Sequence, residues 1–102
     1  MIKLALFARL EAKPGKEAAV ADLLATGLAL ARQEATTPIW FALRLSPTTF
    51  GIFDAFHDEA GRQAHLAGPI AQALMSKAPE LLATAPSIER IEVLGLKNDG
   101  TA

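Results

Sequence analysis

Apolar and polar residues alternate near both ends of the chain. In residues 2–12 every second side chain is apolar, which is the two-residue period of a strand with one buried face. The apolar set is Ile2, Leu4, Leu6, Ala8 and Leu10. Residues 87–97 alternate in the same way, so the pattern predicts a strand at each end of the domain.

A helical period replaces this alternation after the "KPG" segment at 13–15. Good helix formers run without a break from Lys16 to about Glu34, and apolar residues recur three and four positions apart. These residues are Val20, Leu23, Leu24, Leu28 and Ala31. Pro38 disfavours helix at the residue before it, so we expect one long amphipathic helix that ends before this proline.

Two further strands are predicted in the middle of the chain. Residues 39–46 and 49–57 are rich in apolar side chains and are separated only by Pro47 and Thr48. Two strands joined by so short a turn form an antiparallel hairpin.

The region after the hairpin predicts two helices in succession. Asp58 can cap the first, because its carboxylate can accept hydrogen bonds from the free amide groups of the first turn. Gly68 ends this helix, and Pro69 suits the first turn of the next, which Pro79 is expected to kink or end. Residues 98–102 form a polar tail that we expect to fray.

The order strand, helix, strand, strand, helices, strand predicts one α+β domain over residues 1–102. It is typical of a ferredoxin-like β-α-β-β-α-β fold, in which helices cover one face of a four-stranded antiparallel sheet. Strict alternation places apolar side chains on the other face too: Phe7, Phe53, Ala55, Ile91 and Val93. A sheet that is apolar on both faces needs cover on both. We therefore expect a homodimer packed sheet to sheet.

Composition excludes several classes of function. About half of the residues are hydrophobic (51%) and the formal net charge is -1 without charged blocks, so no surface for nucleic acid or anionic membrane is indicated. No run approaches the roughly 20 apolar residues of a membrane-spanning helix. The absence of cysteine excludes disulfides and thiolate metal sites and favours a cytoplasmic protein. Neither a phosphate-binding glycine loop nor a recognisable metal motif is present, so we expect no cofactor and no metal.

Asp54 is the most unusual charged residue in the sequence. It lies between Ile52 and Phe56 on an otherwise apolar strand face, where a carboxylate is costly unless it is paired or solvated. Two alternatives follow: Asp54 faces a cavity, or it pairs with Arg9 or Arg44 on a neighbouring strand.

The two histidines differ as candidates for a catalytic base. The pKa of an ordinary histidine lies near operating pH, so His65 in "GRQAHLAGP" is a candidate base, with a solvent-exposed or structurally hydrogen-bonded residue as the alternative. His57, at the end of a strand beside Asp58, is expected to be a loop residue. The aromatic residues on strands either form core or offer flat apolar surface to a ligand.

Four segments carry a resemblance to a known family. They are "LFARLEAKPGKEAAVADLL", "WFAL", "IFDAF" and "AHLAGP". Their order and spacing over residues 2–97 resemble the antibiotic biosynthesis monooxygenase family of dimeric α/β-barrel proteins. The resemblance implies two ferredoxin-like protomers with a β-barrel between their sheets and a pocket between each sheet and its helices. It also implies oxidation of quinol-like or anthrone-like polyphenols by molecular oxygen without metal or flavin, or haem degradation in one branch.

Departures from the family's sequence pattern narrow the choice of activity. Ala8 stands where the haem-degrading branch has an asparagine, and Trp40 lies on a strand instead of a helix, which argues against haem. Some quinol-oxidising members have a second histidine where this chain has Ile70, and the chain contains no tyrosine. The polar catalytic set that the resemblance implies is therefore small.

The resemblance thus implies His65 as base, with Asp54 as its partner, in an apolar pocket for a small aromatic substrate. We expect the wall of this pocket to comprise Trp40, Phe41, Phe56, Leu6, Ala8, Leu66, Ile70 and Leu74. The sequence favours a cofactor-independent monooxygenase, since an electron-rich phenol or anthrone can itself reduce oxygen once it has lost a proton. The alternative is a non-catalytic dimer of the same fold that binds a small ligand or a partner.

Overall fold

The strands and helices follow in the predicted order in the computed structural model, which describes residues 1–98. The strands are β1 (Leu4–Glu11), β2 (Ile39–Arg44), β3 (Thr49–Phe56) and β4 (Ser87–Glu92). The helices are α1 (Glu17–Ala31), α2 (Glu59–Leu66) and α3 (Pro69–Leu81). The strands pair antiparallel in the order β2-β3-β1-β4, which confirms the ferredoxin-like α+β fold.

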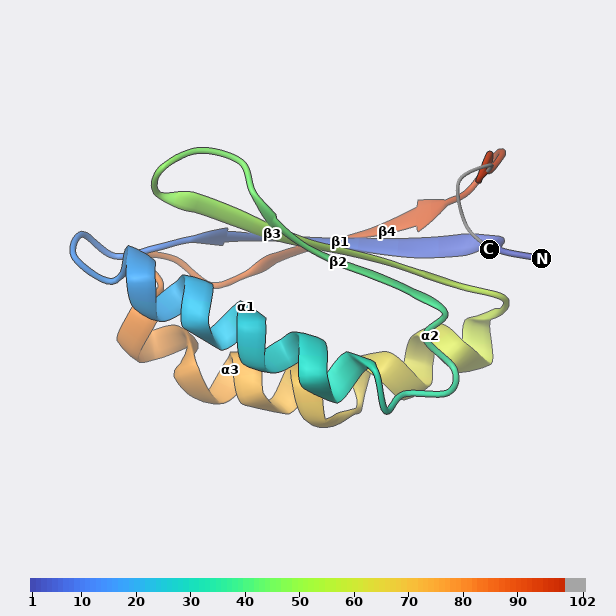
Figure 1. Ribbon diagram of the computed structural model, residues 1–102, viewed down its shortest axis with the longest axis horizontal. Coiled ribbons are helices and arrows are strands. Elements are labelled where there is room, and N and C mark those ends of the chain that lie inside the picture. The colour runs from blue at the N-terminus through green and yellow to red at the C-terminus, as the bar shows by residue number, and fades with distance from the viewer. Residues whose placement is uncertain (99–102) are drawn as a thin grey trace.

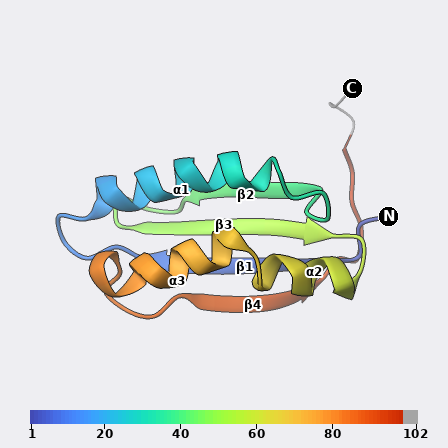
Figure 2. The ribbon, with the colours of Figure 1, turned by 90° about the horizontal axis from the view of Figure 1, so that it is seen from below.

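The molecule has two layers. All three helices lie on one face of the sheet, and the opposite face carries no element of this chain within the described residues (Figure 1). Seen from the helical side, α1 runs along the β2 side of the sheet, and α2 and α3 follow one another along the β1 side (Figure 2). Side chains in the space between the layers are therefore enclosed by both.

Strand register decides which side chains enter this space. Leu6 of β1 lies opposite Asp54 of β3, and Ala8 opposite Ile52, so these residues share the face that the helices cover. Val20 and Leu24 of α1, Phe50 of β3, and Leu74 and Leu81 of α3 complete the main core.

The face without helices is apolar as predicted. Phe7 and Phe41 lie on either side of Phe53 in the register, and Ile91 lies opposite Ala5. The Phe41 and Phe53 ring centroids are 6.3 Å apart, and 54% of Phe41 is exposed. Phe7, Phe41 and Phe53 thus form an aromatic stripe that is partly exposed.

Several element boundaries differ from the prediction. The long helix ends at Ala31, and residues 32–34 continue as a turn in which the amide of Glu34 donates to the Ala31 carbonyl (3.0 Å). The α3 helix continues past Pro79 to Leu81, because a proline this close to the helix end removes one backbone hydrogen bond without preventing the last turn. The last strand ends at Glu92, five residues earlier than position 97.

Residues 99–102 of the predicted tail lie outside the described residues. Within the described part of the chain, no helix has both the length and the apolar character needed to cross a bilayer.

Candidate functional site

Three distant segments bring three ionisable side chains into contact. His65 on α2 lies between Asp54 of β3 and Glu34 of the α1–β2 loop. The His65 Nε2 atom is 2.8 Å from Asp54 Oδ2, and its Nδ1 atom is 2.8 Å from Glu34 Oε1. The side chains of Asp54, His65 and Glu34 are only 3%, 7% and 14% exposed. We call this group the carboxylate–histidine cluster.

The sheet positions Asp54. It lies in a central strand, opposite Leu6 on one side and Trp40 on the other, on the face that the helices cover. Of the two alternatives for Asp54, the structure shows the one without an arginine partner. Arg9 contacts Glu11 (3.5 Å), and the Arg44 guanidinium lies over the Phe50 ring.

The α2 helix positions His65. The Asp58 side chain accepts a hydrogen bond from the Gly61 amide (2.9 Å) and caps the helix, as predicted. Arg62 is buried and its Nη1 donates to the carbonyls of Ala5 (3.3 Å) and Ile91 (3.4 Å), which ties the helix to two strands. The ring of Phe56 packs against that of His65, with centroids 5.5 Å apart. The imidazole is thus held on a rigid part of the fold.

Close packing at two glycines lets the loop carrying Glu34 reach His65. A Cβ atom at Gly61 would lie 3.0 Å from the Thr36 carbonyl oxygen, and one at Gly68 would lie 3.3 Å from Glu34 Oε2. The Thr37 hydroxyl donates to Glu34 Oε1 (2.8 Å) and fixes this carboxylate.

Sequence reasoning missed Glu34, because only the tertiary fold brings this loop residue to the site. One signal was available: a carboxylate just beyond the end of a helix opposes the helix dipole.

Asp54 and His65 of the cluster form one side of a hollow between the sheet and the helices. The hollow contains about 370 Å³ of empty space, part of it open to solvent, and only Asp54 and His65 among its lining residues are polar. Its apolar lining consists of Leu6, Ala8, Ile52, Leu66, Ile70, Ala71, Leu74 and Ile88.

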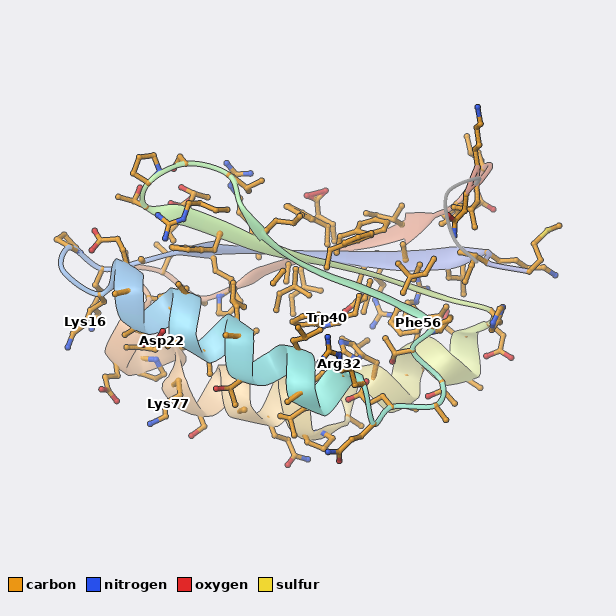
Figure 3. The ribbon with its side chains drawn as sticks, in the orientation of Figure 1. Lys16, Asp22, Arg32, Trp40, Phe56 and Lys77 are labelled. Carbon is orange, nitrogen blue, oxygen red and sulfur yellow. The ribbon has the colours of Figure 1, made fainter. Side chains whose placement is uncertain are left out.

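A second, apolar hollow adjoins the first and contains about 310 Å³ of empty space, part of it open to solvent. Both are lined by Ile52, Ile70 and Leu74, and Trp40 lines the second. Figure 3 shows Trp40 between the sheet and the helices, with Phe56 nearer the α2 end of the same layer. Within the described residues, Trp40 Nε1, Asp54 Oδ1 and Glu34 Oε2 are buried without a hydrogen-bond partner. Trp40 lines the second hollow and Asp54 the first, so each hollow has one residue with an unsatisfied polar atom.

The structure gathers most of the predicted site residues and separates others. Five predicted wall residues line the first hollow with Asp54 and His65: Leu6, Ala8, Leu66, Ile70 and Leu74. Trp40 lines the second hollow, and Phe56 lies behind His65. The placement of Phe41 in the pocket is wrong, because its register opposite Phe53 puts it on the other face of the sheet. His57 is exposed after β3, as expected.

The two carboxylates raise the affinity of His65 for its proton. Burial by itself lowers the pKa of His65, but the hydrogen bonds and charges of Asp54 and Glu34 outweigh it, so the pKa lies above the ordinary 6.5. Burial raises the pKa of Asp54 above 3.8, His65 opposes this shift, and the charge of Glu34 adds to it. Both shifts favour protonation, which brings Asp54 closer to the pH range in which a base is most effective.

Among residues 1–98, no group of three or more histidine and carboxylate side chains is arranged to hold a metal ion. The cluster uses its nitrogen and oxygen atoms chiefly for its own hydrogen bonds. What it offers a ligand is therefore a proton acceptor beside an apolar wall.

Comparison with known proteins supports a family and a fold. No family model matches the sequence, and no curated protein matches it. The crystal structure of a protein of unknown function from Nitrosomonas europaea is 60% identical in sequence, with a TM-score of 0.94 and coverage of 99% of this chain and 98% of that one. The chain belongs to the family of this Nitrosomonas protein.

More distant structures share the fold of this family. One is named "Putative antibiotic biosynthesis monooxygenase" from Nitrosomonas europaea (TM-score 0.80, 14% identity, 90% of each chain covered). Another, with the same description, is from Deinococcus radiodurans (TM-score 0.76, 22% identity, 96% of this chain and 99% of that one covered). The fold is that of the antibiotic biosynthesis monooxygenases, as the sequence resemblance implied.

Proposed function

We propose that this protein is a cofactor-independent monooxygenase that oxidises a small quinol-like or anthrone-like aromatic molecule with molecular oxygen. The observation that carries the proposal is the carboxylate–histidine cluster on the wall of an otherwise apolar hollow. An apolar wall accepts an aromatic ring and limits the entry of water. A buried base beside that wall can remove the proton whose loss makes the ring a reductant of oxygen.

The reaction balances for an anthrone without an external reductant. The Asp54–His65 pair accepts a proton from the methylene carbon, and the carbanion that remains transfers its electrons to oxygen. One oxygen atom becomes the new carbonyl and the other leaves as water with the two hydrogens of the methylene group. The carbon loses four electrons and the oxygen molecule gains four. The protein needs only to bind the substrate, exclude bulk water and move the proton.

The proposal includes a homodimer formed through the open face of the sheet. Phe7, Phe41 and Phe53 lie side by side there, and Phe41 is largely exposed. A contiguous aromatic stripe of this kind is a typical interface core. A second copy of the chain would bury it about a two-fold axis.

Oxygen consumption with a panel of hydroquinones and anthrones tests the proposal. We expect uptake by the wild type, and a loss of roughly 100-fold in His65→Ala, the scale of losing a group that takes part in proton transfer. His57→Ala is the matched control, because His57 is exposed after β3. Circular dichroism and thermal melting would establish that each variant is folded. An unchanged rate in folded His65→Ala would contradict a role for the cluster.

The alternative is a non-catalytic protein that binds a small apolar ligand. The scarcity of polar groups favours it, because only two of the residues that line the first hollow are polar. Trp40 is the single tryptophan and lines the adjoining hollow, so its fluorescence can report binding of the same panel. Saturable binding without oxygen uptake would favour this alternative over the monooxygenase.

A further inference from the structure

The geometry of the cluster determines how many protons it holds. Each of the two 2.8 Å contacts of His65 joins a ring nitrogen to a carboxylate oxygen, and each needs one hydrogen between the two atoms. Three groups therefore share two protons. With both carboxylates ionised and the ring doubly protonated, the cluster has one net negative charge.

Both protons belong on the imidazole ring. An imidazole nitrogen is more basic than a carboxylate, with ordinary pKa values of 6.5 and 3.8 for His65 and Asp54. Glu34 places a second negative charge on the far side of the ring, and this charge stabilises the imidazolium form. The Thr37 hydroxyl donates to the same Glu34 oxygen as His65 Nδ1, which holds the carboxylate in line with the ring.

No other charged side chain contacts the ring in the described residues. Arg62, the nearest basic residue on α2, points its guanidinium at Glu59 and at backbone carbonyls of the sheet. The helix α3 and strand β1 contribute only apolar residues to the hollow beside His65. Asp54 and Glu34 are therefore the groups that set its protonation.

We propose that Asp54 Oδ1 is the atom that accepts the proton from the substrate, and that Glu34 is a positioning residue that keeps His65 doubly protonated behind it. This inference rests on the proposed function and divides the roles within the same site. An imidazolium whose two N–H groups both donate to carboxylates has no lone pair for a substrate proton. Asp54 Oδ1 has no hydrogen-bond partner among residues 1–98, and Asp54 lines the hollow.

The proton-transfer step keeps every hydrogen bond of the cluster. The substrate O–H or C–H bond breaks, its electron pair stays on the substrate, and a new O–H bond forms at Asp54 Oδ1. Asp54 Oδ2 still accepts from His65, and Glu34 still accepts from the other side of the ring. The cluster changes from one net negative charge to neutral, so the negative charge passes to the substrate beside the imidazolium.

Nitrogen-15 NMR of the His65 ring tests the proton arrangement without any substrate. In the wild type at pH 7 we expect both ring nitrogens to have the shifts of protonated nitrogen. Glu34→Gln keeps an acceptor for Nδ1 but removes the charge, so its His65 titration should move to lower pH by roughly one unit or more. Glu80→Gln, an exposed charge removal on α3, is the matched control and should leave the titration unchanged. A singly protonated wild-type ring at pH 7, or equal titrations in the wild type and Glu34→Gln, would overturn the inference.

The pH dependence of oxygen uptake tests the roles. Asp54→Asn keeps an oxygen for His65 but cannot accept the substrate proton, so we expect a loss of roughly 100-fold or more at every pH. In Glu34→Gln, His65 should lose its second proton at lower pH. The rate of oxygen uptake should therefore be retained best at low pH and should fall at a lower pH than in the wild type. A purely structural role of Glu34 would lower the rate equally at all pH values and leave the profile in place.

The two proposals fail in different ways. Folded Asp54→Asn with the wild-type rate would overturn the assignment of the proton acceptor, while the monooxygenase itself would stand. Absence of oxygen uptake by the wild type, together with a doubly protonated His65, would overturn the proposed function and the catalytic role of Asp54. The arrangement of protons and the positioning role of Glu34 would then still be supported by the NMR result.

Discussion

Leu74→Ala joins the two hollows and reports how well their common wall is packed. Leu74 is buried, belongs to the main core and lines both hollows. Removing its side chain beyond Cβ leaves a void that neighbours fill only in part. Ile52 and Ile70 are the other residues common to the two linings, so the enlarged space remains apolar.

The expected loss of stability is about 3 kcal/mol, within the range of roughly 2–5 kcal/mol for a buried leucine replaced by alanine. This value lies in the lower half of the range, because a side chain bordered by two hollows already lacks packing contacts on those sides. For a domain of this size the loss lowers the melting temperature by on the order of 10 °C or more. Urea unfolding at fixed protein concentration measures it, since dimer formation would make stability depend on concentration.

Met75→Ala provides the matched control. Met75 is the next residue of the same helix but is 55% exposed, so its truncation should change stability by no more than about 0.5 kcal/mol. Addition of a small aromatic such as phenol should restore part of the Leu74→Ala loss, because a ligand that binds only the folded state stabilises it. A loss of stability below about 1 kcal/mol, or an equal loss in Met75→Ala, would refute the view that Leu74 is a packed part of the wall between the two hollows.

Three further predictions concern pH, association and ligand binding. Because the pKa of His65 is raised in the folded state, its contribution to stability is complete below pH 6.5 and is lost as pH rises through the folded pKa. Urea unfolding at several pH values should show this fall in the wild type but not in His65→Gln. A stability that rises over this pH range would contradict the prediction. Phe41→Asp places a charge in the aromatic stripe beside Phe53 and should weaken the dimer at least about 10-fold in analytical ultracentrifugation, whereas unchanged association would exclude this face as the interface. Trp40→Phe removes a buried N–H without a partner beside Asp54 and should weaken binding of hydroxylated aromatics, measured by calorimetry, about 5-fold or more; equal affinity would exclude Trp40 Nε1 as a ligand donor.

The fold could be predicted because the periods of the sequence are clear. The alternation in residues 2–12 and the helical spacing after Lys16 each allow one regular structure. The burial of Leu6, Ala8 and Leu10 follows from the alternation, whereas that of Ala5 does not. The errors lie at boundaries. Residues 32–34 have good helical propensity, but the chain turns there because the loop must reach α2.

The site was less predictable, because it depends on register and on loop packing. In "WFAL" every residue is apolar, so alternation cannot tell which side chains face the helices. Only the pairing of Trp40 with Asp54 and of Phe41 with Phe53 settles that Trp40 points inward and Phe41 outward. Glu34 is 31 residues from His65 in the sequence, and no local pattern links the two.

The order of the strands leaves the two edges of the sheet unequally protected against strand addition. The β4 edge has the sequence SIERIE, whose three charged side chains discourage pairing with another chain. The β2 edge, IWFALR, is uncharged up to its last residue and has a row of backbone N–H and C=O groups beside which the described part of the chain places no strand. Aggregation of partly unfolded or concentrated protein should therefore begin at β2 and not at β4.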